Sequence, residues 1–172
     1  SDGFSASNGG CELRSCVAFG NRDGFFANSS RLADCVARSN TQDGFDVASA
    51  TLSGCSATDN ARHGFDLSSS RASDCLASNN DVDGFFSFIG SSIVSCTSSV
   101  NDGAEFRLGS TQNQLRNCDA SRFGYIAVDA ADNVVVGNTA GSYSIVAGNV
   151  AGPIVDEASV ATNTNPAANF DY

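Results

Sequence analysis

The stretch LSGCSATDNARHGFDL at residues 52–67 contains, in order, an apolar residue, a cysteine, a small residue, an asparagine and a Gly-Phe pair. A glycine followed by an aromatic residue recurs about every 20 residues, at Gly3-Phe4, Gly24-Phe25, Gly44-Phe45, Gly64-Phe65, Gly84-Phe85 and Gly124-Tyr125. We assign Gly103-Ala104 to the repeat that is missing between Gly84 and Gly124. A cysteine column keeps the same spacing of about 20 residues: Cys16, Cys35, Cys55, Cys75, Cys96 and Cys118. Two independent columns with one period indicate a repeat architecture.

Within each repeat the apolar side chains are two residues apart, as in Phe65-x-Leu67, which is the period of a β-strand. Serine clusters such as residues 68–70 predict bends between short strands, and so do the Asp-Gly pairs, which tolerate positive φ. Coils stacked at about 4.8 Å would place identical side chains in ladders and so build a continuous core. One further ladder of amides is expected at a bend, from Asn21, Asn40, Asn60, Asn80 and Asn101.

The coil resembles the repeat of the right-handed parallel β-helix proteins of the pectin-lyase-like superfamily. The residues that carry the resemblance in one unbroken coil are Leu52, Cys55, Ala57, Asn60, Gly64, Phe65 and Leu67. It covers about residues 2–150 and implies an all-β, right-handed parallel β-helix, a solenoid of about seven coils. The resemblance is specific for fold only, because that superfamily includes lyases, hydrolases, epimerases, phage tailspikes and non-catalytic surface proteins. The Asp-Pro-His motif of the alginate epimerases is missing from the sequence.

The repeat markers stop before the C-terminus. We therefore expect a β-helix domain over residues 1–150 and an irregular cap and tail over residues 151–172. The chain begins inside a repeat, so its first coil is expected to lack a cap, either as a piece of a longer protein or because another chain covers it. Since an open coil exposes unpaired strand edges, we predict a homo-oligomer or an end-to-end contact that covers Phe4, Phe19 and Phe26.

Charge and composition exclude several functions. The net charge is −10, and the nine basic residues are all arginines, which argues against binding to nucleic acid or to anionic membranes. With one histidine and no C-x-x-C motif, we predict no metal site and no cofactor, and calcium is left open only as a bridge to an acidic polysaccharide. The seven cysteines are expected to be reduced and, apart from Cys11, buried.

The position after each aromatic residue is expected to point outward and supplies the candidate site. That column is predicted to contain Ser5, Phe26, Asp46, Asp66, Phe86, Glu105 and Ile126. The carboxyl groups of Asp46 and Asp66 would lie about 5 Å apart on adjacent coils, a separation typical of retaining glycosidases. Phe26, Phe86 and Glu105 are the predicted sugar-contacting residues beside this catalytic pair.

His63 is the third catalytic candidate, because it occupies the repeat position of Asp23, Asp43 and Asp83. Carboxylates on the coils either side are expected to raise the pKa of His63 and make it a general base. The alternative is a turn residue in a tolerant position.

Two functions are consistent with these features. The leading hypothesis is a non-catalytic β-solenoid, a structural or glycan-contacting module of a bacterial-type protein located outside the cell or on its surface. The alternative is a carbohydrate-active enzyme, a glycoside hydrolase or a lyase-like protein, acting on a polysaccharide along the solenoid face. A net charge of −10 repels polyuronates, so a neutral polysaccharide is the expected partner.

Overall fold

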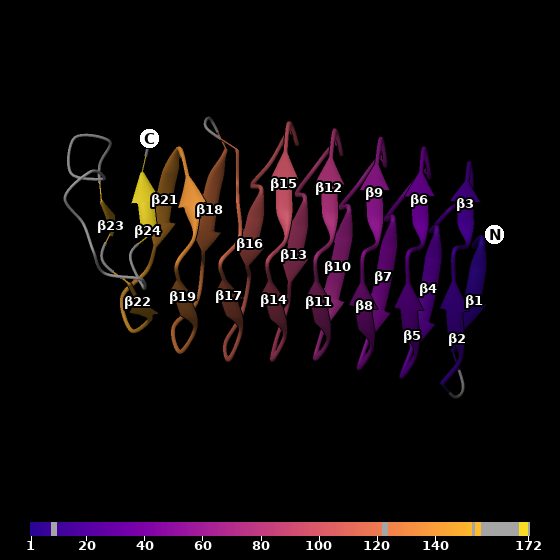
Figure 1. The fold of residues 1–172 in the computed structure, drawn as a ribbon, viewed down its shortest axis with the longest axis horizontal. Coiled ribbons are helices and arrows are strands. Elements are labelled where there is room, and N and C mark those ends of the chain that lie inside the picture. The colour runs from indigo at the N-terminus through magenta and orange to yellow at the C-terminus, as the bar shows by residue number, and fades with distance from the viewer. Residues whose placement is uncertain (8–9, 122–123, 153, 156–168, 172) are drawn as a thin grey trace.

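The computed structural model describes residues 1–7, 10–121, 124–152, 154–155 and 169–171. Its strands stack in rows along one axis, with the first coil at one end and the C-terminal strands at the other (Figure 1). All strand pairs are parallel, and the described residues contain no helix and therefore none that could cross a membrane.

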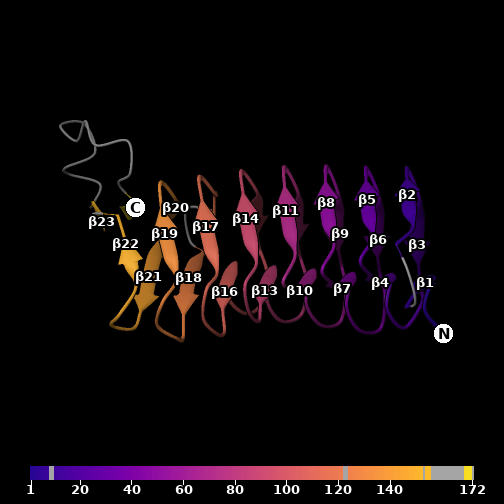
Figure 2. The same cartoon turned by 90° about the horizontal axis from the view of Figure 1, so that it is seen from below.

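Three sheets form the walls of the solenoid. The first sheet contains, in spatial order, β1 (Phe4–Ala6), β4 (Phe25–Asn28), β7 (Phe45–Ala48), β10 (Phe65–Ser68), β13 (Phe85–Ser87), β16 (Phe106–Leu108), β18 (Tyr125–Val128) and β21 (Ser142–Ile145). The second sheet, a continuous row in Figure 2, contains β2 (Glu12–Arg14), β5 (Arg31–Ala33), β8 (Thr51–Ser53), β11 (Arg71–Ser73), β14 (Ser92–Val94), β17 (Gln114–Arg116), β19 (Val134–Val136) and β22 (Val150–Ala151). The third sheet contains β3 (Val17–Phe19), β6 (Val36–Arg38), β9 (Ser56–Thr58), β12 (Leu76–Ser78) and β15 (Thr97–Ser99).

The apolar columns predicted from the repeat form the core. The rings of Phe4, Phe25, Phe45, Phe65, Phe85 and Phe106 stack with centroids 4.5–5.0 Å apart. A second column places Leu32, Leu52, Ala72, Ile93 and Leu115 in register on the second sheet, all fully buried. Because each ring sits one strand spacing from the next, a coil buries its apolar side chains only through its neighbours.

All seven cysteines are free thiols, as predicted. Cys35, Cys55, Cys75, Cys96 and Cys118 are buried, whereas Cys11 and Cys16 are partly exposed. The sequence analysis predicted that all six cysteines of the column are buried. This prediction was wrong for Cys16, which lies in the first coil.

The asparagine column forms the predicted amide ladder. The Nδ2 atom of Asn40 donates to Oδ1 of Asn60 at 2.8 Å, and Asn60 donates in the same way to Asn80. Asn80 then donates to Asn101 at 2.8 Å. The ladder satisfies buried amides at the bend between the third and first sheets, which supports its structural interpretation.

The glycine before each aromatic residue has a different role from the predicted one. Positive φ occurs elsewhere, at bend residues such as Ser29, Ser49 and Ser69, and not at Gly44 or Gly64. A Cβ atom on Gly44 would lie 2.6 Å from the carbonyl oxygen of Gly64. These glycines are therefore required because the neighbouring coil passes too close for a side chain.

The C-terminal strands continue the pairing. β22 pairs with β19, so the second sheet extends across the predicted domain boundary at residues 150/151. β24 (Asn169–Asp171) lies between β20 (Thr139–Ala140) and β23 (Ile154–Val155) in a small separate sheet. Most of the predicted tail, residues 156–168, is outside the described residues.

Candidate functional site

The outward positions of the first sheet bring four predicted site residues into one row. On neighbouring strands, Phe26 is in register with Asp46, Asp46 with Asp66, and Asp66 with Phe86. We call Phe26, Asp46, Asp66 and Phe86 the outward row, and all four side chains are half-buried. The structure thus confirms that the two carboxylates lie on adjacent coils between two aromatic rings.

Glu105 and Ile126 do not belong to this row, so their predicted outward placement was wrong. Phe86 is followed in register by Arg107 and then by Ala127. Ile126 is fully buried in the aromatic column, and Glu105 is 3% exposed. Phe106, and not Gly103-Ala104, supplies the aromatic position of the coil that contains Glu105. On the next coil Ile126, and not Tyr125, is in register with Phe106.

The buried Glu105 ends the amide ladder. Its Oε2 atom accepts a hydrogen bond from the hydroxyl group of Ser98 at 2.8 Å and another from Nδ2 of Asn101. Gly124 makes room on the following coil, because a Cβ atom there would collide with the side chain of Glu105. Glu105 therefore has a structural role inside the coil and cannot reach a ligand at the outward row.

A second ladder runs beside the outward row, at the bend that precedes the first sheet. We call Asp23, Asp43, His63 and Asp83 the turn ladder. Each accepts a backbone N–H from the next coil: Asp43 N donates to Asp23 at 3.2 Å, His63 N to Asp43 at 3.0 Å, Asp83 N to Nδ1 of His63 at 3.3 Å, and Ala104 N to Asp83 at 2.8 Å. His63 therefore occupies the predicted position between two carboxylates.

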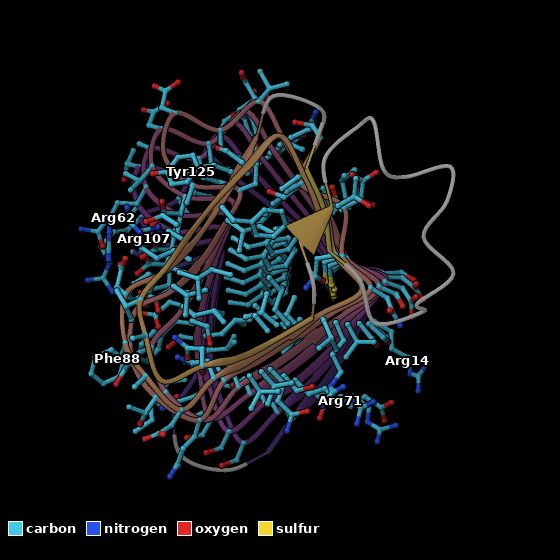
Figure 3. The ribbon with its side chains drawn as sticks, turned by 90° about the vertical axis from the view of Figure 1, so that its left-hand side faces the viewer. Arg14, Arg62, Arg71, Phe88, Arg107 and Tyr125 are labelled. Carbon is cyan, nitrogen blue, oxygen red and sulfur yellow. The ribbon has the colours of Figure 1, made fainter. Side chains whose placement is uncertain are left out.

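Arg62 connects the two rows. Its Nη1 atom donates to Oδ2 of Asp43 at 2.8 Å, and its Nη2 atom lies 3.6 Å from Oδ2 of Asp66. Arg62 and Arg107 lie on the same side of the solenoid when it is viewed along its axis, away from Arg14 and Arg71 (Figure 3). Asp43, His63 and Asp66 each offer one potential metal-ligand atom, and these three atoms lie within 4.8 Å of one another.

The carboxylates of this face are not fully compensated by positive charge. Burial and the neighbouring Asp43 and Asp46 carboxylates raise the pKa of Asp66 to about 7. Burial likewise raises the pKa of Asp43 to about 6, although the backbone N–H of His63 and the charge of Arg62 oppose the shift. The pKa of Asp46 is also raised, by burial and then by Asp23. Part of the Asp66 carboxyl group therefore keeps its proton near neutral pH.

The predicted direction of the His63 pKa shift was wrong. Burial lowers the pKa of His63 to about 4, and the positive charges of Arg62 and Arg107 lower it further. The imidazole is 10% exposed, so the loss of hydration outweighs the attraction of the flanking carboxylates. His63 is neutral at pH 7, with Nδ1 accepting a hydrogen bond.

The two rings of the outward row have different surroundings. The imidazole of His63 covers one face of Phe86, with centroids 5.0 Å apart and planes inclined by 18°. Among the described aromatic residues, none stacks on Phe26. Phe26 therefore offers the freer apolar surface beside the carboxylates.

Asp83 has one oxygen atom without a hydrogen bond. Its Oδ1 accepts the backbone N–H of Ala104, while Oδ2 is buried and accepts no hydrogen bond. This oxygen lies 3.4 Å from Nδ1 of His63 and 3.8 Å from Nη1 of Arg107. Buried polar atoms without a hydrogen bond are rare in proteins, so this oxygen requires an explanation.

Neither a protein-family model nor a curated protein sequence matches the chain. Its structure is similar to the A-modules of the mannuronan C-5 epimerases AlgE6 and AlgE4 of Azotobacter vinelandii, each with a TM-score of 0.51 and 14% sequence identity. Both alignments cover 93% of this chain, and 56% and 57% of those two chains. The chain is a parallel β-helix repeat protein. At this identity the likeness concerns the fold alone, and the β-helix spans little more than half the length of these two structures.

Sequence reasoning missed two residues of this face. Arg107 follows Phe86 in the outward row, and Asp43 belongs to the cluster with His63 and Asp66. The signal for Arg107 was Phe106, since counting the aromatic column from Phe85 to Phe106 would have placed Arg107 outward. Nothing in the sequence pattern of the β-helix marked Asp43 as different from Asp23 or Asp83.

The apolar residues of the first coils do not form one surface. Phe26 lies on β4 of the first sheet, whereas Val17 and Phe19 are exposed on β3 of the third sheet. The guanidinium group of Arg38 lies over the ring of Phe19, 5.0 Å from its centroid. The predicted oligomer of the β-helix stays a prediction.

Proposed function

We propose that this β-helix is a glycan-binding module and that the outward row is its contact surface. The observation that carries the proposal is the strand register of Phe26, Asp46 and Asp66, which aligns an apolar ring with two hydrogen-bond acceptors on successive coils. Aromatic faces and carboxylates are the groups that bind the apolar face and the hydroxyl groups of a sugar. The two similar structures are named as mannuronan epimerases, and their polysaccharide partner supports the ligand class.

The proposed glycan is neutral. Three arginines lie along the outward row and the turn ladder, and all are engaged with carboxylates: Arg22 with Asp2 and Asp23, Arg62 with Asp43 and Asp66, and Arg107 with Asp83 and Asp129. A polyuronate would therefore meet carboxylates, and arginines that these carboxylates already engage. We place the protein outside the cell or on its surface, where such polysaccharides occur.

Binding is tested by affinity electrophoresis and calorimetry with neutral glucans, mannans and galactans and with a polyuronate. We expect retention by a neutral polymer and its loss in Phe26→Ala. Phe19→Ala is the matched control, because it removes an exposed ring from the third sheet. Equal retention of wild type and Phe26→Ala by every polymer would contradict the proposal.

A second candidate function is glycoside hydrolysis by Asp46 and Asp66. It is favoured by the pKa of Asp66 at about 7, which keeps part of that carboxyl group protonated near neutral pH, as a general acid requires. The test is release of reducing ends from the same neutral polymers by wild type and by Asp66→Asn. Release that Asp66→Asn abolishes supports hydrolysis, and equal background release from both proteins rejects it.

A further inference from the structure

Asp43, His63 and Asp66 combine two ligand types that a divalent transition metal prefers. The group consists of one imidazole and two carboxylates, contributed by the turn ladder and the outward row. Imidazole favours Zn²⁺, Co²⁺ and Ni²⁺, whereas calcium and magnesium sites are built from oxygen ligands. The sequence prediction of no metal site rested on the single histidine and the missing C-x-x-C motif. It placed carboxylates on the coils either side of His63 but did not foresee that Asp66 lies close to His63 and Asp43.

Only small movements would bring the three groups to metal-binding distances. Their ligand atoms lie within 4.8 Å of one another, whereas ligands of a tetrahedral zinc ion with bonds of about 2.1 Å lie roughly 3.4 Å apart. Asp43 is fixed through Oδ1 by the backbone N–H of His63, and its Oδ2, which accepts a hydrogen bond from Nη1 of Arg62 at 2.8 Å, is the atom that a metal would take over. The side chain of Asp66 is 23% exposed, and Arg62 is its ion-pair partner, at 3.6 Å.

Arg62 occupies the position of a cation in this structure. It contacts both Asp43 and Asp66, but its own side chain is 46% exposed. The guanidinium group can therefore move into water when a metal ion replaces it between the two carboxylates. Arg62 is a competitor for the site rather than an obstacle to it.

Asp83 supplies an independent indication of a ligand. A histidine that binds a metal through one ring nitrogen usually donates its other N–H to a carboxylate. Oδ2 of Asp83 is such an acceptor: the side chain is 1% exposed, this oxygen accepts no hydrogen bond, and it lies 3.4 Å from Nδ1 of His63 and 3.8 Å from Nη1 of Arg107. Transfer of the ring proton from Nε2 to Nδ1 would satisfy this oxygen and free the Nε2 lone pair, at the expense of the long 3.3 Å hydrogen bond from Asp83 N.

We propose that Asp43, His63 and Asp66 form a binding site for a divalent transition-metal ion of the Zn²⁺ type, with Asp83 positioning His63. The metal has three protein ligands, and water or a ligand hydroxyl group completes its coordination. This inference goes beyond glycan binding and does not depend on it, because metal binding is measured without any glycan.

The test is calorimetric titration of chelator-treated, reduced protein with ZnCl₂, repeated with CoCl₂ and its visible absorption spectrum. We expect one Zn²⁺ per chain, and a Co²⁺ spectrum without thiolate charge-transfer bands, because the site contains no cysteine. Excess Ca²⁺ should not displace the metal. His63→Gln and Asp66→Asn should lose this binding, and Asp83→Asn should weaken it about 10- to 100-fold.

Two controls separate metal binding from damage to the fold. Asp74→Asn makes the same acid-to-amide change at an exposed bend of the second sheet and should bind as wild type does. Arg62→Gln removes the competitor and should bind Zn²⁺ more tightly than wild type. No Zn²⁺ binding by wild type, or binding unchanged in both His63→Gln and Asp66→Asn, would overturn the proposal, as would weaker binding by a folded Arg62→Gln.

Discussion

Replacing Cys55 tests how the cysteine column contributes to stability. Cys55 is 1% exposed, and its Sγ lies 3.5 Å from the carbonyl oxygen of Ser53, two residues earlier. Cys35 and Cys75 make the same contact at 3.3 and 3.2 Å. At the neighbouring bend, the hydroxyl groups of Ser30 and Ser70 donate to the carbonyl two residues earlier at 2.8 Å. A serine at position 55 therefore has an acceptor already in place.

These contacts set the expected magnitudes. If the hydroxyl group of Cys55→Ser donates a hydrogen bond to a carbonyl oxygen, the substitution should lower the free energy of unfolding by about 1 kcal/mol or less. Without such a hydrogen bond it would lower the free energy of unfolding by about 1–3 kcal/mol. Cys55→Ala removes the sulfur and leaves a small void between the neighbouring coils, which should cost about 0.5–1.5 kcal/mol, as the loss of one buried methyl group does. We therefore expect Cys55→Ser to be no less stable than Cys55→Ala.

Urea denaturation of the wild type and both variants measures these differences, provided the slope with denaturant is unchanged. Thiol labelling of the native protein is the complementary assay. Cys11 and Cys16 should react first, while Cys35, whose pKa burial raises to about 11, should react only on unfolding. A loss clearly above about 1 kcal/mol in Cys55→Ser, or a Cys55→Ser variant less stable than Cys55→Ala, would refute the argument that the serine hydroxyl finds an acceptor. Rapid native labelling of the five buried thiols would refute the register itself.

Three further predictions concern single positions. Gly44→Ala should cost about 1–3 kcal/mol or more in urea denaturation, because its Cβ would lie 2.6 Å from a backbone oxygen, whereas Gly20→Asn, at φ +70° with open space, should change stability little. Glu105→Ala should cost about 1–3 kcal/mol by leaving Ser98 and Asn101 without their acceptor, and an unchanged midpoint would contradict the role of Glu105 in the ladder. Burial and neighbouring acids raise the pKa of Asp66 to about 7. The folded protein therefore keeps a proton on Asp66 that the unfolded chain releases near pH 4, about the ordinary pKa of an aspartate. This contribution to stability is lost as the pH rises from about 4 to about 7. Asp66→Asn should therefore gain stability relative to wild type over that range in thermal melts, and a difference independent of pH would contradict the raised pKa.

The repeat was predictable because, in a solenoid, residues that are one repeat apart in the sequence are neighbours in space. Phe45, Phe65 and Phe85 are one period apart in the sequence and stack in the structure for that reason. The same rule correctly predicted that Asp46 faces Asp66. It failed at Glu105, because a Gly-Ala pair two residues before Phe106 imitated the repeat marker, and only the buried aromatic column fixes the register there.

The electrostatics of the site could not be predicted from the same pattern. The sequence shows that His63 lies between carboxylates but not that its side chain is buried, and burial decides the direction of its pKa shift. It also does not show that Arg62 is shared between Asp43 and Asp66 while Oδ2 of Asp83 has no donor. These features depend on side-chain packing at the bend rather than on the period.

Stacking also explains why this face is the best candidate for a ligand. In a β-helix every outward residue lies about 4.8 Å from its counterparts, so consecutive acids repel one another unless something intervenes. The chain limits this cost by placing the neutral His63 between Asp43 and Asp83 and Arg62 between Asp43 and Asp66. Burial first, and then the charges of Asp43 and Asp46, raise the pKa of Asp66 to about 7, so part of this carboxyl group still holds a proton near neutral pH. A bound metal ion would offset the same repulsion while the carboxylates stay ionised, and its binding free energy would stabilise the folded coil.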